Sequence, residues 1–208
     1  GLILHTIVPH PSDPARMWVG ISSVGVFETR DGGASWHTRN TGVRAEFNPE
    51  NRFPEYGLCV HKLVIAADSG ERLFQQNHCG VYRSDDAGAS WERLDENGLP
   101  SPFGFGLALD PFDPDTAFVI PEESAENRVT PNGRLGIYRT TDAGASWELI
   151  VAEEPAWAAV LREGMSFDGE AVYAGTQSGH VYALRHDEVV EAARHLPPIL
   201  SVEAAAWR

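Results

Sequence analysis

The sequence predicts an all-β fold built from repeated antiparallel units, and three observations support this prediction. The chain of 208 residues contains 20 Gly, 14 Pro and 6 Trp, which is typical of many short strands joined by turns. One motif occurs three times, and the residues that close it, Trp36, Trp91 and Trp147, are 55 and 56 positions apart. A second pattern, Pro-x-Asp-Pro, lies upstream of two of these copies. Because a fixed period of this size marks a repeat architecture, each copy is expected to belong to one structural unit.

The repeated motif covers residues 25–36, 80–91 and 136–147, which read GVFETRDGGASW, GVYRSDDAGASW and GIYRTTDAGASW. Each copy begins with a β-branched and aromatic run that predicts a short strand. An Asp then enters a tight turn, where its carboxylate accepts backbone N–H groups, and a Gly supplies a positive φ. A Ser closes the turn through its hydroxyl, and a Trp begins the return strand. These structural positions are Asp31, Gly33, Ser35 and Trp36, then Asp86, Gly88, Ser90 and Trp91, and finally Asp142, Gly144, Ser146 and Trp147.

The motif matches Ser/Thr-x-Asp-x-Gly-x-Ser/Thr-Trp, so the chain resembles the BNR or Asp-box repeat β-propellers, which include sialidase-like and glycosyl-hydrolase-like proteins, some of them bacterial. The resemblance implies an all-β propeller of four-stranded antiparallel blades, with the box joining the third and fourth strands of a blade. It implies about four blades in this chain as part of a larger ring, because propellers of this type usually have more blades. It also implies that the boxes lie far from any active site.

A single domain over residues 1–208 is expected, with blades at about 2–40, 57–95, 104–151 and 157–208. In blades one and three the Pro-x-Asp-Pro pattern predicts a turn between the first two strands. Blade four lacks the box, and its residues 189–195 predict either a helical turn or a modified outer strand. The apolar run at 199–202 predicts a terminal strand that completes another blade.

The charge balance argues against two classes of partner. Lys and Arg number 16 against 30 Asp and Glu, a formal charge of −14, which repels phosphate backbones and makes nucleic-acid binding unexpected. No apolar run is long enough for a transmembrane helix, so no membrane partner is predicted. We therefore expect a soluble protein, with a cytoplasmic location favoured over secretion. The oligomeric state is left open.

Strand order predicts which loops share a face. When four strands alternate in direction, the boxes and the Pro-x-Asp-Pro turns lie together on one face. The loops after the second and fourth strands form the opposite face, the mouth of the propeller, where long loops favour function. Candidate ligand-binding residues in these mouth loops are Arg44, Arg52, Tyr56, Gln75, Gln76, Asn77, His78, Glu122, Glu123 and Arg128, with Phe103, Phe105 and Trp157 nearby.

Each candidate has a functional and a structural interpretation. The polar run 75–78 forms either a cluster that binds a sugar or small ligand, or a turn whose side chains satisfy the neighbouring backbone. Glu122 and Glu123 either supply the paired carboxylates that a glycosidase needs or lie in a solvated acidic loop, which the acidic composition favours. The arginines could resemble those that hold a sialic-acid carboxylate in sialidases. The Phe/Tyr-Arg-Ile-Pro motif of that family is absent, however, and no Tyr–Glu nucleophile pair can be assigned.

No metal and no cofactor is predicted, because the sequence has no His-x-His, His-Glu-x-x-His or Cys-x-x-Cys spacing. His61, His78 and Cys79 could approach one another in blade two, which leaves a zinc site as a remote alternative. The two cysteines, Cys59 and Cys79, are expected on strands two spacings apart, roughly 9.5 Å, which is too far for a disulfide.

Two functions follow from these patterns. The first is a non-catalytic Asp-box propeller that binds a carbohydrate or protein ligand, which suits mouth loops without recognisable paired carboxylates. The alternative is a sialidase-like or BNR-repeat glycoside hydrolase, with part of its active site in blades outside this chain. A weaker similarity, to the Asp-box propeller that helps assemble photosystem II, rests on the shared repeat alone.

Overall fold

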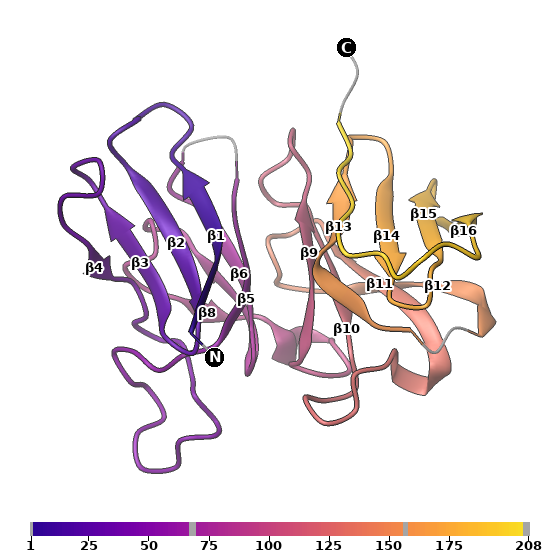
Figure 1. The fold of residues 1–208 in the computed structure, drawn as a ribbon, viewed down its shortest axis with the longest axis horizontal. Helices are drawn as coiled ribbons and strands as arrows, with labels where there is room; N and C mark the ends of the chain where they lie inside the picture. Colours follow the sequence, from indigo (N-terminus) through magenta and orange to yellow (C-terminus); the bar gives the residue numbers. More distant parts are fainter. Residues whose placement is uncertain (1, 67–69, 156–157, 206–208) are drawn as a thin grey trace.

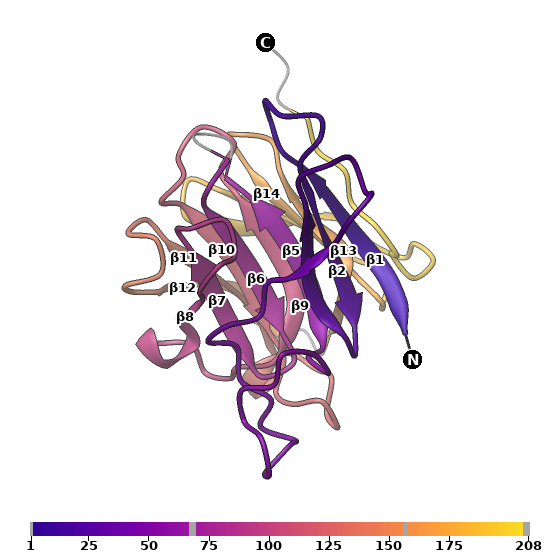
Figure 2. The same ribbon diagram turned by 90° about the vertical axis from the view of Figure 1, so that its left-hand side faces the viewer.

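Four four-stranded antiparallel sheets follow one another along the chain as blades (Figure 1, Figure 2). This computed structural model describes residues 2–66, 70–155 and 158–205, with the backbone alone described for 151–155. Blades one and two contain β1 (Ile3–Pro9), β2 (Met17–Ser22), β3 (Gly25–Thr29) and β4 (His37–Thr38), then β5 (Val60–Ile65), β6 (Leu73–Asn77), β7 (Gly80–Ser84) and β8 (Glu92–Arg93). Blades three and four contain β9 (Gly104–Leu109), β10 (Ala117–Pro121), β11 (Arg134–Thr140) and β12 (Glu148–Pro155), then β13 (Val160–Phe167), β14 (Val172–Thr176), β15 (Val181–Arg185) and β16 (Glu188–Ala193). The predicted all-β fold of four-stranded antiparallel blades is confirmed.

Apolar side chains between successive blades form the core, in three clusters. Blade one packs on blade two around Trp18 and Leu63, and both side chains are almost fully buried. The second cluster includes Phe74 of blade two and Leu107 of blade three, and the third joins blades three and four. Short 3-10 turns, η1 (Asp95–Asn97) and η2 (Pro131–Gly133), lie in the connections. Blades two and three thus bury both faces against neighbours, and blades one and four bury one face each, as the layered packing of β structure requires.

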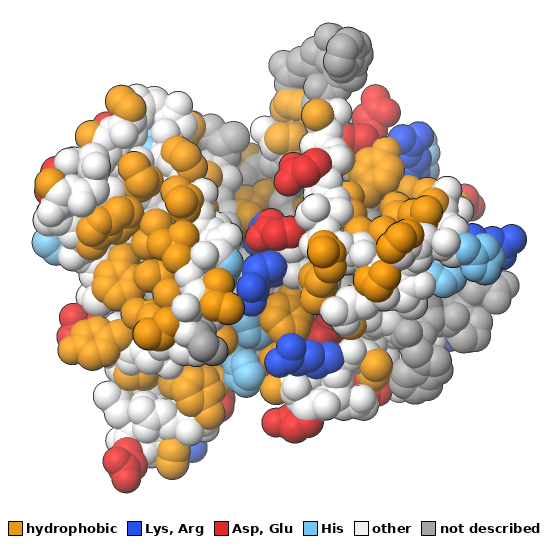
Figure 3. All heavy atoms as spheres, viewed as in Figure 1, with side chains coloured by type: hydrophobic (Ala, Val, Ile, Leu, Met, Phe, Trp, Pro, Cys, Tyr) orange, Lys and Arg blue, Asp and Glu red, His pale blue; other side chains and the backbone are white. Residues whose placement is uncertain are grey.

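Blade one also carries exposed apolar side chains along its first strand. Leu2, Ile3, Leu4 and Ile7 are each more than half exposed. Hydrophobic side chains gather over this part of the molecule in Figure 3. Exposed apolar side chains that lie together in this way form a surface that can pack against another surface.

Backbone hydrogen bonds place the boxes and the first loop of each blade on one face. In blades one to three, the residue after the Asp of the box donates its N–H to the loop between the first two strands. The donor and acceptor pairs are Gly32 with Ala15, Ala87 with Glu71, and Ala143 with Asp115, at 2.8–2.9 Å. The loops after the second and fourth strands therefore meet at the opposite, mouth face.

The box of blade two shows how the motif holds its turn. Asp86 accepts the backbone N–H of Ser90 on Oδ1 at 2.8 Å and its hydroxyl on Oδ2 at 2.6 Å. The hydroxyl of Ser84 donates to Oδ1 at 2.7 Å and accepts the N–H of Gly88 at 2.7 Å. Gly88 has φ of 85°, a conformation that a Cβ would strain. The turn therefore closes through its own side chains.

The same bonds recur at the other two boxes and stabilise the ionised carboxylates. Hydrogen bonds led by the hydroxyl of Ser35 hold the pKa of Asp31 at about 2. Those led by the hydroxyl of Ser146 do the same for Asp142. Donors that prefer the charged form lower a carboxyl pKa in this way.

We expect Asp86→Ala to destabilise the protein by about 1–3 kcal/mol, because the backbone and hydroxyl donors of the turn lose their acceptor. Chemical denaturation of the full chain measures this. The matched control is Asp85→Ala, because Asp85 is a half-exposed neighbour whose carboxylate makes ion pairs with Arg72 and Arg83. Its loss should cost less than about 1 kcal/mol. Equal costs for the two variants would contradict a turn-holding role for the box.

Blade four replaces the box with a two-residue turn. His186 and Asp187, with φ of 46° and 65°, connect β15 to β16. Positive φ at both central residues is the type I′ pattern that suits a tight hairpin. Of the two alternatives for residues 189–195, the structure shows the outer strand, since β16 ends at Ala193.

The terminal run at 199–202 lies against blade four rather than forming a strand of another blade. Ser201 makes one parallel bridge to Glu163 in β13. The N–H of Ile199 donates to Thr176 at 3.0 Å, and that of Val202 to Glu163 at 2.7 Å. Gly175 permits this approach, because a Cβ there would lie 2.3 Å from Ile199. The prediction of a terminal strand that completes another blade is therefore wrong, because this run packs on the last blade of the chain itself.

None of the helices in the described ranges has the length and apolarity needed to cross a membrane.

Candidate functional site

The mouth loop, residues 39–57, connects β4 to β5 and extends from the face opposite the boxes (Figure 1). The N–H of Gly57 donates to Val24 O, in the turn between β2 and β3, at 2.9 Å. Within the loop, the N–H of Ala45 donates to Arg52 O at 2.9 Å, and Val43 and Ala45 are fully buried. The loop is therefore held in shape before any ligand arrives.

Three aromatic side chains stand out of this anchored loop. Phe47, Phe53 and Tyr56 are 54%, 56% and 60% exposed. Phe53 also lines a pocket of about 500 Å³ with Thr38, Asn40, Thr41, Gly42, Pro54 and Glu55. That volume lies within the range of small-ligand pockets and suits one or two side chains of a partner.

The sequence-predicted Arg44, Arg52 and Tyr56 all belong to the mouth loop. The guanidinium of Arg44 lies 5.9 Å from the centre of the Phe53 ring and pairs with Glu96 at 3.4 Å. Arg52 and Tyr56 are exposed. Their side chains are thus accessible, and the loop combines aromatic rings with cationic groups.

The predicted polar cluster at 75–77 is buried, not open to a ligand. Gln75, Gln76 and Asn77 are at most 1% exposed. The Gln76 amide donates to the carbonyls of Asn77, Gly80 and Pro102 at 2.9–3.3 Å. The structural interpretation therefore describes Gln76, whose amide ties the end of β6 to neighbouring backbone. Gln75 Nε2 has no partner among the described residues.

Beside them, five side chains form what we call the mouth cluster: His61, His78, Phe103, Phe105 and Arg128. The ring of His61 stacks on Phe105 with centroids 4.3 Å apart and meets His78 edge-on at 5.5 Å. Phe103 contacts both histidines at 5.2 Å. The guanidinium of Arg128 lies 5.3 Å from the Phe105 ring centre, a cation–π geometry. Of the predicted site residues, His78 and Arg128 are brought together here.

Burial favours the neutral form of both histidines of the mouth cluster by lowering their pKa values. Burial lowers the pKa of His61 to about 3, although its hydrogen bond to Gly104 opposes the shift. Burial, with the charge of Arg128, also lowers the pKa of His78. Neutral imidazoles offer a lone pair to a metal or to a hydrogen-bond donor.

The two cysteines are free, as expected, but the one that lies beside the histidines is not the one that was predicted. Cys79 is buried, and its Sγ accepts the N–H of Glu46 at 3.4 Å. Cys59, not Cys79, lies with His61 and His78, and the ligand atoms of these three are all within 4.8 Å of one another. Cys59 takes the place predicted for Cys79 because of the direction in which the side chains point at the β6–β7 turn. Sequence spacing does not determine that direction.

Glu122 is a buried carboxyl at the end of β10. It is 1% exposed, and burial raises its pKa to about 7. Its Oε1 accepts the N–H of Val160 at 3.2 Å, and its Oε2 has no partner in the described ranges. Glu123 beside it is exposed and accepts the side-chain amide of Asn127. The two carboxyls therefore occupy different environments, one buried and one exposed.

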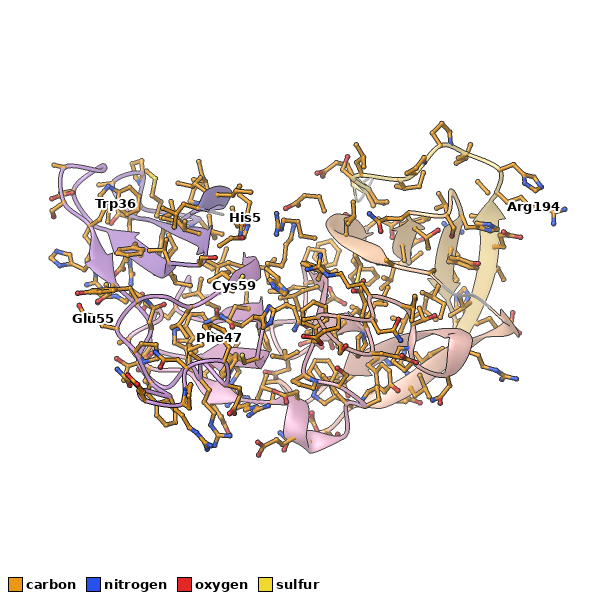
Figure 4. All side chains as sticks on the ribbon, turned by 60° about the horizontal axis from the view of Figure 1, so that its bottom comes forward. His5, Trp36, Phe47, Glu55, Cys59 and Arg194 are labelled. Atoms are coloured by element: carbon orange, nitrogen blue, oxygen red, sulfur yellow. The ribbon has the colours of Figure 1, made fainter. Side chains whose placement is uncertain are left out.

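Charged side chains also meet in the crevice between the two halves of the molecule (Figure 3). Lys62 of β5 pairs with Glu163 of β13. A pocket of about 300 Å³ lies there, lined mainly by apolar residues of β5, β9 and β13. In Figure 4, Cys59 and Phe47 lie on the side of the first blades that faces this crevice, whereas Trp36 and Arg194 lie at opposite outer ends.

Sequence reasoning missed Cys59 and Arg162 as members of this region. The Nε of Arg162 donates to His61 O at 3.1 Å across blades, a contact between positions 101 residues apart. The sequence signal that could have identified Arg162 is the presence of a polar residue in the first strand of blade four. Trp157, named as a mouth residue, lies outside the described residues.

Comparisons with known proteins agree on the architecture. No family model matches the chain. Vacuolar protein sorting/targeting protein 10 of Verticillium alfalfae is 30% identical over 125 residues, which are 56% of this chain and 8% of that protein. The chain thus spans a small part of this curated relative.

Solved structures extend the likeness to most of the chain. An ancestral GH74 enzyme superposes with a TM-score of 0.63 and 18% identity, over 89% of this chain and 23% of that one. The GH74 xyloglucanase from Xanthomonas campestris gives 0.59 and 16%, over 91% and 30%. YCF48 from Cyanidioschyzon merolae gives 0.58 and 21%, over 93% and 57%. At these identities the likeness concerns the fold. With its three boxes and four antiparallel blades, the chain has the fold of the BNR/Asp-box β-propellers.

Proposed function

We propose that this chain is a non-catalytic binding module that holds a segment of another protein against the mouth loop. The observation that carries the proposal is an anchored loop that exposes Phe47, Phe53 and Tyr56 beside a pocket of about 500 Å³. A preorganised loop loses little conformational entropy on binding, so more of the contact energy remains as affinity.

The chemistry of the loop suits a protein partner. Aromatic and Arg side chains dominate the energy of protein interfaces, and the loop offers both in Tyr56, Phe53 and Arg52. Asn40 and Thr38 supply polar groups at the pocket, both already linked to Glu55. The sorting function in the name of the Verticillium alfalfae relative is in keeping with a protein ligand. Aromatic surfaces also bind carbohydrates, so the test must distinguish a carbohydrate ligand from a peptide.

The experiment selects peptides from a random display library on the immobilised chain and measures the enriched peptide by fluorescence anisotropy. Phe53→Ala and Tyr56→Ala should weaken binding by about 10-fold or more, because hot-spot aromatics contribute above about 1 kcal/mol each. Phe112→Ala is the matched control, since Phe112 is an equally exposed aromatic at 55% in a loop on the box face. Unchanged affinity in the loop variants, or capture of glycans on an array without any peptide, would refute the proposal.

One observation favours a second candidate, a glycoside hydrolase. Glu122 has a pKa of about 7, which suits a general acid. Its exposed fraction of 1% places it out of reach of a substrate in this conformation. Turnover of a chromogenic glycoside that Glu122→Gln abolishes would establish this alternative.

A further inference from the structure

Three side chains with metal-binding atoms meet at the inner edge of blade two. Cys59 comes directly before β5, His61 lies within β5, and His78 lies in the turn between β6 and β7. Their ligand atoms, one thiol sulfur and two imidazole nitrogens, are all within 4.8 Å of one another. No hydrogen bond to Cys59 Sγ or to the ring of His78 is present among the described residues.

The backbone brings these residues together through local geometry. The N–H of His78 donates to Cys59 O at 2.9 Å, which fixes the turn against the strand. The register between β5 and β6 shifts between Val60 and Lys62, so His61 is the extra residue of a β-bulge. A bulge re-aims the side chain that it carries and often does so beside a functional site.

The hydrogen bond of His61 determines which of its nitrogens is free. Its Nδ1 lies 2.7 Å from the carbonyl oxygen of Gly104. A carbonyl only accepts, so Nδ1 carries the proton and Nε2 keeps its lone pair. Metal-binding histidines commonly donate their other ring N–H to a carbonyl, which orients the ring and raises its basicity.

We propose that Cys59, His61 and His78 bind a divalent ion of the zinc class, with the fourth coordination position open to solvent at the mouth. Sulfur and imidazole ligands together suit zinc, and three protein ligands with one open position are a known arrangement for it. Ligand lengths of about 2.0–2.3 Å imply separations of roughly 3.3–3.6 Å between ligand atoms. The ligand atoms, which lie within 4.8 Å of one another, must therefore approach by up to about 1 Å, a movement that half-buried His78 can supply from its turn.

Two positive groups shape what the fourth position accepts. Arg128 and Arg162 both act electrostatically on His61. They oppose a bare cation and favour an anion, such as hydroxide or a ligand carboxylate, bound to the metal. This inference concerns the cluster alone and does not depend on the mouth loop binding a peptide.

The test uses the full chain, stripped of metal under reducing conditions and titrated with Co²⁺, which reports thiolate ligation by a charge-transfer absorption band. Zn²⁺ should bind in a 1:1 ratio, displace Co²⁺ and raise the melting temperature. Cys59→Ser should abolish the charge-transfer band. The matched control is Cys79→Ser, which changes the chain's other cysteine and should keep the band.

His78→Ala provides a second variant that is easier to fold, because His78 is only half buried in a turn. It should weaken Zn²⁺ binding by more than the roughly 10- to 100-fold that loss of an outer-shell partner costs. His37→Ala, in exposed β4, is its control and should leave the affinity unchanged. The proposal is overturned if the wild type shows no saturable 1:1 binding, or if metal-free Cys59→Ser or His78→Ala folds normally and still binds as the wild type does.

Discussion

Replacing Trp91 by Ala is expected to destabilise the protein by about 3–5 kcal/mol, the usual cost of removing a buried Trp. Trp91 is 6% exposed and packs in the core cluster between blades one and two. Its indole N–H donates to Arg39 O in the preceding blade at 2.8 Å. The variant therefore loses apolar contacts and leaves a carbonyl without its donor. Denaturation with urea, followed by intrinsic fluorescence and circular dichroism, measures the change.

Trp36→Ala is the matched control for this prediction. Trp36 occupies the same position of the first box, but it is 40% exposed. Its loss should cost less than half as much, because less apolar area returns to water. Similar costs at the two positions would show that the boxes act as isolated turns and do not join blades.

Replacing Glu122 by Gln is expected to stabilise the protein at pH 8 by about 1–3 kcal/mol. Burial raises the pKa of Glu122 from 4.5 to about 7, so the folded state prefers the protonated carboxyl. A pKa that is higher in the folded state stabilises the fold. This stabilisation is fully present when the pH is below the pKa of the unfolded state, and it is lost as the pH rises through 7. A pKa raised this far corresponds to about 3 kcal/mol at most, and Gln retains an acceptor for the Val160 N–H.

The sign of this effect can be checked by its pH dependence. The gain from Glu122→Gln should be present at pH 8 and small or reversed near pH 4.5, where the wild-type carboxyl is protonated in the folded state and already half protonated in the unfolded state. Glu123→Gln is the control, because it makes the same chemical change in the adjacent side chain, which is exposed. A difference between Glu122→Gln and wild type that stays constant from pH 4.5 to pH 8 would contradict a buried, neutral carboxyl.

The repeats carried enough information to predict the architecture. A strand, an Asp turn and a Trp within twelve residues form a hairpin through contacts that are local in sequence, as at Asp86. Alternation of strand direction then assigned each loop to a face, and the bonds from Gly32, Ala87 and Ala143 confirm the box face. Local rules worked here because each hairpin satisfies its own polar groups.

The sequence predicted which region contains the candidate site, but not which of its side chains are exposed. The mouth loop was identified by its length, and it does expose Arg52 and Tyr56. The polar run at 75–77 was an equally good candidate by composition, yet its side chains are buried, and the Gln76 amide donates to the carbonyls of Gly80 and Pro102. Composition records which groups are polar, but not whether a neighbouring loop covers them.

The sequence by itself determined the hairpin boxes, the antiparallel blades and the separation of a box face from a mouth face, because these depend on residues near one another in the chain. Only the tertiary structure decided that Cys59 and not Cys79 joins His61 and His78, and that Glu122 is buried. Those outcomes depend on a bulge at His61 and on contacts between blades, such as Val160 with Glu122. Packing between distant segments sets the exposure and direction of a side chain, and no short sequence pattern records it.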